Sequence, residues 1–161
     1  MIRGALLVAA ALAVAGAPER ADAAATDPWP GVASAYLVRI DGEVRWAAND
    51  AARMKPASLT KMMTAVLVVE ALAPSSEVVV SKRAAAADGV RLGLRAGMRL
   101  PVEHLLAAAL LRSVNDACLA LAERVAGSEA VFVARMNERA AALGLADTHF
   151  ANACGFDAPD H

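Results

Sequence analysis

The segment that decides the fold is Lys55-Pro56-Ala57-Ser58-Leu59-Thr60-Lys61-Met62-Met63-Thr64-Ala65. A helix is expected to begin at Ser58 and to end near Ala73, because Pro74 cannot continue it. Its apolar side chains cover most of its circumference, which is typical of a buried helix at the centre of a domain. They are Met62, Met63, Val66, Leu67, Val69 and Leu72.

Ser58 and Lys61 stand three residues apart, which puts two side chains on one helix face with Cβ atoms about 5–6 Å apart. A serine hydroxyl becomes a good nucleophile when a base takes its proton. A lysine can be that base when it is neutral, and burial among apolar side chains favours the neutral amine. The pair therefore predicts a nucleophile and its base. The alternative is that Ser58 or Thr60 only caps the helix and Lys61 points to solvent.

A second candidate motif, Ser113-Val114-Asn115, falls in a break between two expected helices. The first helix starts at Pro101 and ends near Leu111, and the second runs from about Asp116 to Gly127. A hydroxyl and an amide on such a turn can pass a proton to a leaving amine and hold a substrate amide. The alternative is again that Ser113 or Asn115 caps the following helix.

The mature chain is expected to open with two strands, Val32 to Ile40 and Glu43 to Ala48, because Asp41-Gly42 between them is a strong hairpin signal. Further along we expect a short strand, a short helix and a longer helix. They are Glu77 to Val80, Ser81 to Ala87, and Ser128 to Leu143 with Gly144 as its stop. A two-stranded hairpin is marginal alone, and no partner strands are apparent after residue 100.

The N-terminus has the three parts of a signal peptide. Arg3 gives the positive region, Ala5 to Ala15 the apolar region, and Ala21-Asp22-Ala23 the cleavage site. The apolar run to Gly16 is too short to span a membrane, which takes roughly 20 residues. We therefore predict a signal peptide over residues 1–23, an exported protein and a domain over 24–161. A disordered alanine-rich terminus is the alternative.

Composition excludes some functions. The chain has 161 residues, enough for one modest domain, and its net charge of −1 gives no attraction for nucleic acid or an anionic membrane. The three histidines, His104, His149 and His161, lack metal-ligand spacing, and His104 is expected on a helix surface. No metal or other cofactor is expected. The aromatic residues Trp29, Tyr36 and Trp46 are interpreted as packing residues.

The two cysteines, Cys118 and Cys154, could pair in an exported protein. However, Cys118 falls within an apolar helical run, where a cysteine often acts as a small buried residue. This position favours free thiols.

Together the two motifs resemble those of the penicillin-recognising serine peptidases. The wider similarity, over about residues 32–161, is to the D-alanyl-D-alanine carboxypeptidases of family S11, the low-molecular-mass penicillin-binding proteins. It is carried by the segment from Lys55 to Ala65, Gly93-Leu94-Arg95-Ala96-Gly97, Leu105-Leu106, Ser113 to Cys118, Leu121-Ala122-Glu123, Leu143-Gly144-Leu145, Thr148-His149-Phe150, Asn152, Gly155 and Asp157.

The resemblance implies an α/β fold, part of the β-lactamase/transpeptidase-like architecture, with an antiparallel sheet flanked by helices and a helical subdomain. It implies that Ser58 attacks the carbonyl between two D-alanines of a peptidoglycan stem peptide after Lys61 takes its proton. Ser113 would deliver a proton to the departing D-alanine, and Asn115 would bind the peptide. β-Lactams would acylate Ser58.

Three departures from the family pattern stand out. Val114 replaces a glycine, and Cys154 stands where the family often has histidine. The family's third motif, Lys-Thr-Gly on an edge strand, is missing, because no lysine follows Lys82. That strand binds the substrate carboxylate and supplies one oxyanion-hole N–H, whose loss costs about 10²–10³ in rate. We therefore expect a fragment or a truncated product, with the C-terminal strands of the sheet absent.

Three other functions compete with this one. A class A β-lactamase shares the first motif, but its second motif is usually Ser-Asp-Asn with a later glutamate, and here no glutamate follows Glu138. An incomplete site could also bind wall peptides without turnover. A purely structural exported domain would leave the four residues Ser58, Lys61, Ser113 and Asn115 unexplained.

Overall fold

A computed structural model describes residues 29–161 of the chain. The predicted signal peptide lies outside the described residues. The chain divides into two compact units, one ending at Arg53 and the other spanning Met54–His161. Each unit is described by itself below.

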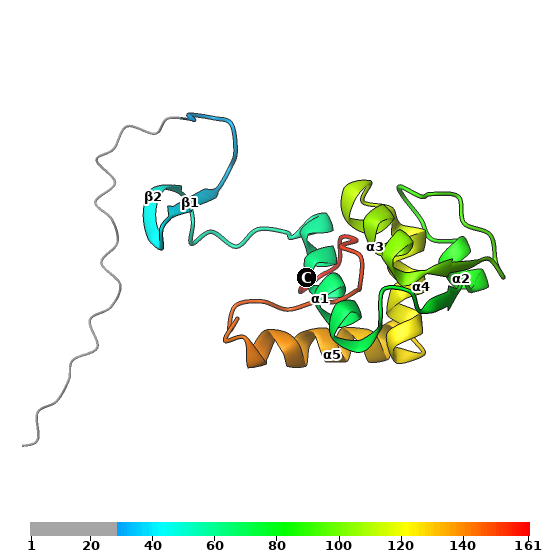
Figure 1. The fold of residues 1–161 in the computed structure, drawn as a ribbon. Coiled ribbons are helices and arrows are strands. Elements are labelled where there is room, and N and C mark those ends of the chain that lie inside the picture. Colours follow the sequence, from blue (N-terminus) through cyan, green and yellow to red (C-terminus); the bar gives the residue numbers. More distant parts are fainter. Residues whose placement is uncertain (1–28) are drawn as a thin grey trace, which may run out of the picture. The chain divides into compact units, whose positions relative to one another are not determined.

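The first unit holds the predicted hairpin. Strand β1 (Tyr36–Ile40) pairs antiparallel with β2 (Glu43–Ala48), with Tyr36 opposite Ala48 and Ile40 opposite Glu43. Asp41 and Gly42 both have positive φ, 52° and 84°, as a tight two-residue hairpin turn requires. The hairpin prediction is thus confirmed, although the first strand begins at Tyr36 rather than Val32 (Figure 1).

The aromatic residues of this unit pack on one another, as predicted. The Trp29 ring lies edge-on to Tyr36 and Trp46, with centroid distances of 5.8 and 5.2 Å. Even so, no side chain between residues 29 and 53 is fully buried. Residues 29–53 of the first unit therefore form an aromatic cluster without a buried core.

The second unit is mainly helical. Its elements are η1 (Ala57–Leu59), α1 (Thr60–Ala71), β3 (Glu77–Val79), α2 (Lys82–Ala85), β4 (Arg99–Pro101), α3 (Val102–Leu111), α4 (Asn115–Ala126) and α5 (Glu129–Ala142). They match the predicted elements except for β4, which pairs antiparallel with β3 so that Leu100 lies opposite Val78. A three-residue strand next to Gly97 has too few residues to show the alternation by which strands are recognised.

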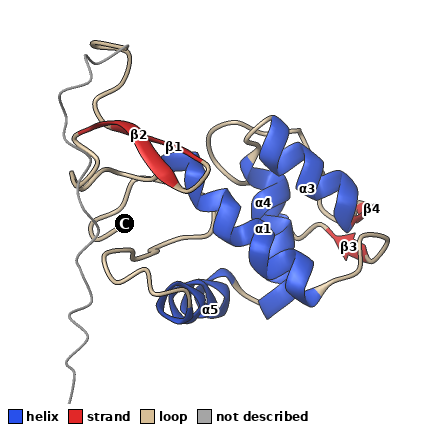
Figure 2. Cartoon of the chain, turned by 60° about the vertical axis from the view of Figure 1, so that its left-hand side comes forward, coloured by secondary structure: helices blue, strands red, loops and turns tan. Residues whose placement is uncertain are grey.

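Helix α4, not α1, is at the centre of this unit, and the prediction for α1 was wrong. Helix α4 packs against α1, α2, α3, α5 and β3, and its first eight residues, Asn115 to Ala122, are all buried. In α1 the apolar residues Met62 and Val69 are both 63% exposed. Figure 2 shows α4 behind α1, with α5 and α3 on either side. Three of the eight buried residues of α4 are alanines, and a prediction based on large apolar side chains gives such residues little weight.

The helix boundaries follow local chemistry. Ser128 accepts a hydrogen bond from the Val131 N–H and caps α5, and Ser81 caps α2 through the Ala84 N–H. Helix α4 ends at Gly127, whose φ of 77° is left-handed. His104 is exposed on α3, as expected. Within residues 29–161, no helix has the length and apolar character that crossing a membrane demands.

Candidate active site

Ser58 lies in the 3₁₀ turn that leads directly into α1. Its hydroxyl caps neither helical element, because neither η1 nor α1 has a side-chain cap. The preceding residue, Ala57, has a φ of 45°, an uncommon conformation for a residue other than glycine. Ser58 itself is exposed. The capping interpretation of Ser58 is therefore wrong, and its hydroxyl is free to react.

Lys61 is buried beside Ser58, with only 3% of its surface exposed. Its Nζ lies 3.1 Å from Ser58 Oγ and donates a 2.7 Å hydrogen bond to the backbone oxygen of Cys154. No carboxylate in the described part of the chain forms an ion pair with it. Burial lowers the pKa of Lys61 below the ordinary lysine value. The amine therefore points at the serine rather than to solvent and is poised to be neutral.

Ser113 reaches the same hydroxyl from the turn before α4. Its Oγ donates a 2.6 Å hydrogen bond to Ser58 Oγ. Its φ of 55° is left-handed, and such strain is common at functional sites. Val114, not Ser113, occupies the N-cap position, and no side chain caps α4. The structure thus brings Ser58, Lys61 and Ser113 together, and the capping interpretation of Ser113 is also wrong.

Asn115 is the first residue of α4 and is held by the loop before β4. Its backbone N–H donates to the Val90 oxygen at 2.7 Å, and its side-chain Nδ2 donates to the Asp88 oxygen at 2.8 Å. Gly89 lies so close that an added Cβ would be 2.9 Å from Nδ2. The amide nitrogen is therefore fixed by this loop, and capping is excluded for Asn115 as well.

The valine between these two residues needs no glycine-like backbone. Val114 has φ −75° and ψ 136°, which is the ordinary extended region. Its side chain is buried in the core. Its replacement of the family's glycine therefore leaves the geometry of the motif intact.

Asp116 fastens the loop that holds Asn115. Its buried carboxylate accepts hydrogen bonds from the backbone N–H groups of Leu92, Gly93, Leu94 and Ala117, at 2.9–3.0 Å. Burial alone would raise its pKa, but these N–H groups outweigh burial and lower the pKa of Asp116 below its usual range. Asp116 is thus ionised and acts as a clasp between the loop and α4.

The segment 152–156 covers the other side of the nucleophile and is called the acceptor loop below. Its Cys154 oxygen receives the Lys61 amine, and its Ala153 oxygen receives the Thr64 hydroxyl at 2.6 Å. Gly155 lies directly against the turn before Ser58, since a Cβ there would be 1.9 Å from the Ala57 oxygen. Only glycine, here with a φ of 89°, allows this approach.

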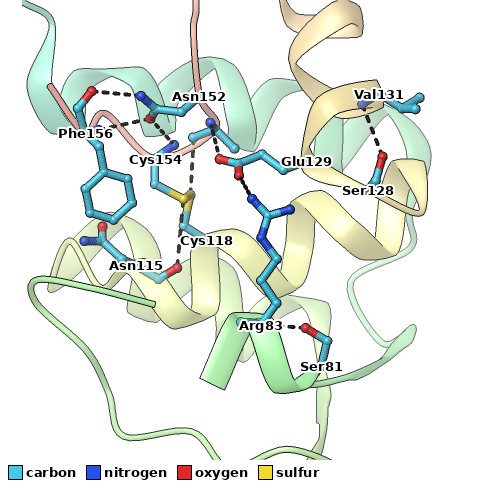
Figure 3. Close-up of polar contacts among 12 residues, drawn as sticks. Ser81, Arg83, Asn115, Cys118, Ser128, Glu129, Val131, Asn152, Cys154 and Phe156 are labelled. Carbon is cyan, nitrogen blue, oxygen red and sulfur yellow. Dashed lines mark hydrogen bonds and ion pairs between the residues drawn. A yellow bond between two sulfur atoms is a disulfide. The ribbon is translucent and has the colours of Figure 1, made fainter. Parts of the chain in front are cut away.

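The two cysteines form a disulfide, so the prediction of free thiols was wrong. Cys118 on α4 and Cys154 in the acceptor loop are bonded, with Cα atoms 6.0 Å apart (Figure 3). The acceptor loop folds back over α4 and brings together two residues 36 positions apart. The predicted export was the signal that favoured pairing.

A serine hydroxyl, a buried lysine and a second hydroxyl within hydrogen-bonding distance define a serine-nucleophile site. Comparison with known proteins gives the family. The model of the D-alanyl-D-alanine carboxypeptidases, peptidase family S11, matches residues 25–161. The chain belongs to this family.

Known relatives agree with this assignment. The D-alanyl-D-alanine carboxypeptidase DacF of Bacillus subtilis is 39% identical over 134 residues, covering 80% of this chain and 34% of the relative. The crystal structure of the D-alanyl-D-alanine carboxypeptidase DacD from Francisella tularensis superposes with a TM-score of 0.75 at 32% identity, covering 80% of this chain and 33% of that one.

A third similar structure is penicillin-binding protein D2 from Listeria monocytogenes in its ampicillin-bound form. Its TM-score is 0.65 at 33% identity, with 80% of this chain and 54% of that one covered. The predicted fold class, part of a β-lactamase/transpeptidase-like α/β fold, is confirmed. In the described residues its strands form two separate two-stranded antiparallel sheets. The chain spans about a third of the length of the curated relatives it matches.

Proposed function

We propose that the protein is an exported serine-type D-alanyl-D-alanine carboxypeptidase that removes the terminal D-alanine from peptidoglycan stem peptides. The observation that carries this proposal is the contact of Ser58 Oγ with both Lys61 Nζ and Ser113 Oγ, in a chain of this family. Predicted export through residues 1–23 puts the enzyme on the side of the membrane where the wall lies.

The proposed reaction begins with proton transfer. The neutral Lys61 amine takes the Ser58 hydroxyl proton as Ser58 Oγ attacks the carbonyl carbon between the two D-alanines. The C–N bond then breaks, and a proton passes through Ser113 to the departing amine. The acyl-enzyme is released when water attacks the ester and a proton returns to Ser58.

The Ser58 N–H is suited to half of the oxyanion hole. It belongs to the first turn of a helix, where N–H groups have no intrahelical acceptor. The second donor in this family comes from the Lys-Thr-Gly strand, and the last lysine of this sequence is Lys82. Full turnover is therefore proposed for a protein that also carries that strand.

Asn115 is proposed to bind the stem peptide. Its Nδ2 is already engaged by the Asp88 oxygen, so the amide oxygen is the atom left to accept a peptide N–H. β-Lactams are proposed as acylating inhibitors of Ser58, which the ampicillin-bound Listeria relative supports. The second candidate function, binding wall peptides without turnover, applies to the 161-residue chain, because it lacks the third motif.

Acylation by a fluorescent penicillin tests the proposal. The wild-type protein should carry one adduct on Ser58, located by peptide mass spectrometry, and Ser58→Ala should carry none. Ser128→Ala is the matched control, since Ser128 only caps α5, and it should be labelled like the wild type. A folded protein with the third motif that forms no adduct would contradict the enzymatic function.

A further inference from the structure

The disulfide lies one peptide group away from the atom that orients the proposed base. Cys154 contributes its sulfur to the bond with Cys118 and its backbone oxygen to Lys61 Nζ, 2.7 Å away. Cys118 is in turn three residues beyond Asn115 on the central helix. The bridge therefore connects the environment of Lys61 with the helix that carries the second motif.

The acceptor loop has a shape of its own but few attachments. The Asn152 side-chain oxygen accepts hydrogen bonds from the N–H groups of Cys154 and Phe156, at 3.2 and 3.0 Å (Figure 3), and from the Gly155 N–H at 2.7 Å. These bonds fix the loop internally and do not hold it against α1. The loop is attached to α1 by the Lys61 amine and the Thr64 hydroxyl, to α5 by the Ala153 N–H on Glu129, and to α4 by the disulfide, and Gly155 packs against the turn before Ser58. The disulfide is the covalent one among them.

The amine of Lys61 needs a fixed partner to act as a base. A neutral amine has two N–H groups and one lone pair, and the lone pair must point at the Ser58 proton during attack. An N–H held by the Cys154 oxygen limits rotation about the last carbon–nitrogen bond and leaves the lone pair free to face Ser58. If the loop moved away, the amine could rotate and water could reach it.

We propose that the Cys118–Cys154 disulfide positions Lys61, by holding the Cys154 carbonyl oxygen against its amine. The disulfide is thus a positioning element for the reaction as well as a crosslink. This inference rests on the proposed function for its effect on rate, but its effect on Lys61 can be measured without any substrate.

The substrate-free test is amine labelling of the full-length protein and of its Cys118→Ala/Cys154→Ala variant. Within this sequence the only lysines are Lys55, Lys61 and Lys82, so peptide mass spectrometry separates them, and exposed Lys82 is the internal reference. The rate of acetic anhydride labelling, measured over a range of pH, gives the pH at which each amine reaches half of its maximal reactivity. This pH is called its midpoint. The variant should label Lys61 faster, with a midpoint shifted upward toward that of Lys82.

Penicillin acylation of the same two proteins provides the second readout. The variant should be acylated about tenfold to a hundredfold more slowly, since a misplacement of about 1 Å can cost 10²-fold in rate. Leu105→Ala, a core change on α3, is the control for lowered stability, and it should leave the Lys61 midpoint and the acylation rate unchanged below its melting temperature.

The outcomes separate the two proposals. An unchanged Lys61 midpoint and an unchanged acylation rate in the cysteine variant would overturn the positioning role. If neither protein is acylated in a form that also carries the third motif, the proposed function fails, and the labelling result alone decides whether the disulfide positions Lys61. An effect equal to that of Leu105→Ala would reduce the disulfide to a structural crosslink.

Discussion

Helices α1 and α4 each begin at one half of the site, but they are held in different ways. Helix α4 is buried on all sides over its first eight residues, and Asp116 clasps the neighbouring loop at its start. Helix α1 is buried on one side only, and its reactive groups are held by the acceptor loop. The position of Ser113 thus follows from core packing, whereas that of Lys61 depends on a distant stretch of chain.

Removal of the Lys61 amine should have the largest effect. Lys61→Met keeps a long apolar stem and removes the proposed base, so acylation by penicillin should fall about 10²–10⁴-fold, the usual contribution of a general base. The variant removes the desolvation cost of the buried amine but leaves the buried Cys154 oxygen without its Lys61 donor, so stability should fall by no more than about 1–3 kcal/mol. Stopped-flow acylation and thermal melts measure the two effects, and a loss of stability well above this range would mean that the Lys61 amine contributes more to folding than one hydrogen bond.

The pH dependence of Lys61 has a definite sign. Its folded pKa is lowered by burial, so the unfolded chain binds more protons between that value and about 10.4. Stability should therefore rise with pH across this window in the wild type and stay flat in Lys61→Met. Acylation should rise with pH through the lowered value, as the amine becomes neutral. Denaturant melts at several pH values check the first expectation.

The next largest loss of stability is expected at the contact between Gly155 of the acceptor loop and the turn before Ser58. Gly155→Ala would put a Cβ 1.9 Å from the Ala57 oxygen, and overpacking of this kind costs about 1–3 kcal/mol. Backbone strain at a φ of 89° adds roughly another 1 kcal/mol or more. Gly144→Ala is the control, because it shares a positive φ but meets no atom within 4 Å. Equal losses in the two variants would mean that the close approach is unimportant.

The third largest effect on stability is expected at Asp116, whose carboxylate holds the loop at the start of α4. Asp116→Asn puts an amide NH₂ among backbone N–H groups, and the resulting unsatisfied donors cost about 1–3 kcal/mol. Because the folded pKa of Asp116 is lowered, its stabilisation is complete above the unfolded value of about 3.9 and is lost as pH falls through the folded value. Urea melts at neutral and acid pH should show this loss in the wild type but not in the variant. Exposed Asp147→Asn should change neither.

The smallest effect is expected on the open side of α1. Val69→Gln should change stability by less than about 0.5 kcal/mol, as surface substitutions usually do. Leu121→Ala on α4 should cost about 2–5 kcal/mol, since Leu121 is fully buried. Thermal melts of the two variants give the contrast directly, and similar losses would mean that the two helices are buried alike.

Local patterns predicted most of the fold. The Asp41-Gly42 hairpin, the cap at Ser128 and the break between the helices around Ser113 all depend on neighbouring residues, and the structure has them within about one residue of where they were expected. The i, i+3 spacing of Ser58 and Lys61 likewise put both on one side of a helix. The central position of α4 was missed because its buried residues include three alanines and the polar pair Asn115 and Asp116, so that only Leu119 and Leu121 are large apolar side chains.

The parts of the site that could not be predicted are those contributed across long sequence distances. Nothing near Lys61 indicates that its acceptor is an oxygen 93 positions away, because a backbone carbonyl has no residue signature. Gly155 and the Cys118–Cys154 disulfide hold that acceptor in place. Their roles can be recognised only in the folded chain, where residues far apart in the sequence are in contact. The hydrogen bonds of Asp116 could not be predicted for the same reason, since their donors are backbone N–H groups.

The long separation between Lys61 and the acceptor loop has a consequence for synthesis of the protein. Ser58 and Lys61 leave the ribosome early, about 90 residues before Cys154. Until the acceptor loop emerges and docks, the Lys61 amine is solvated and protonated, and the nascent chain has a serine without a base. Ser58 is thus without its proposed base during translation, and the pair is assembled only when a later stretch of the same chain docks against it.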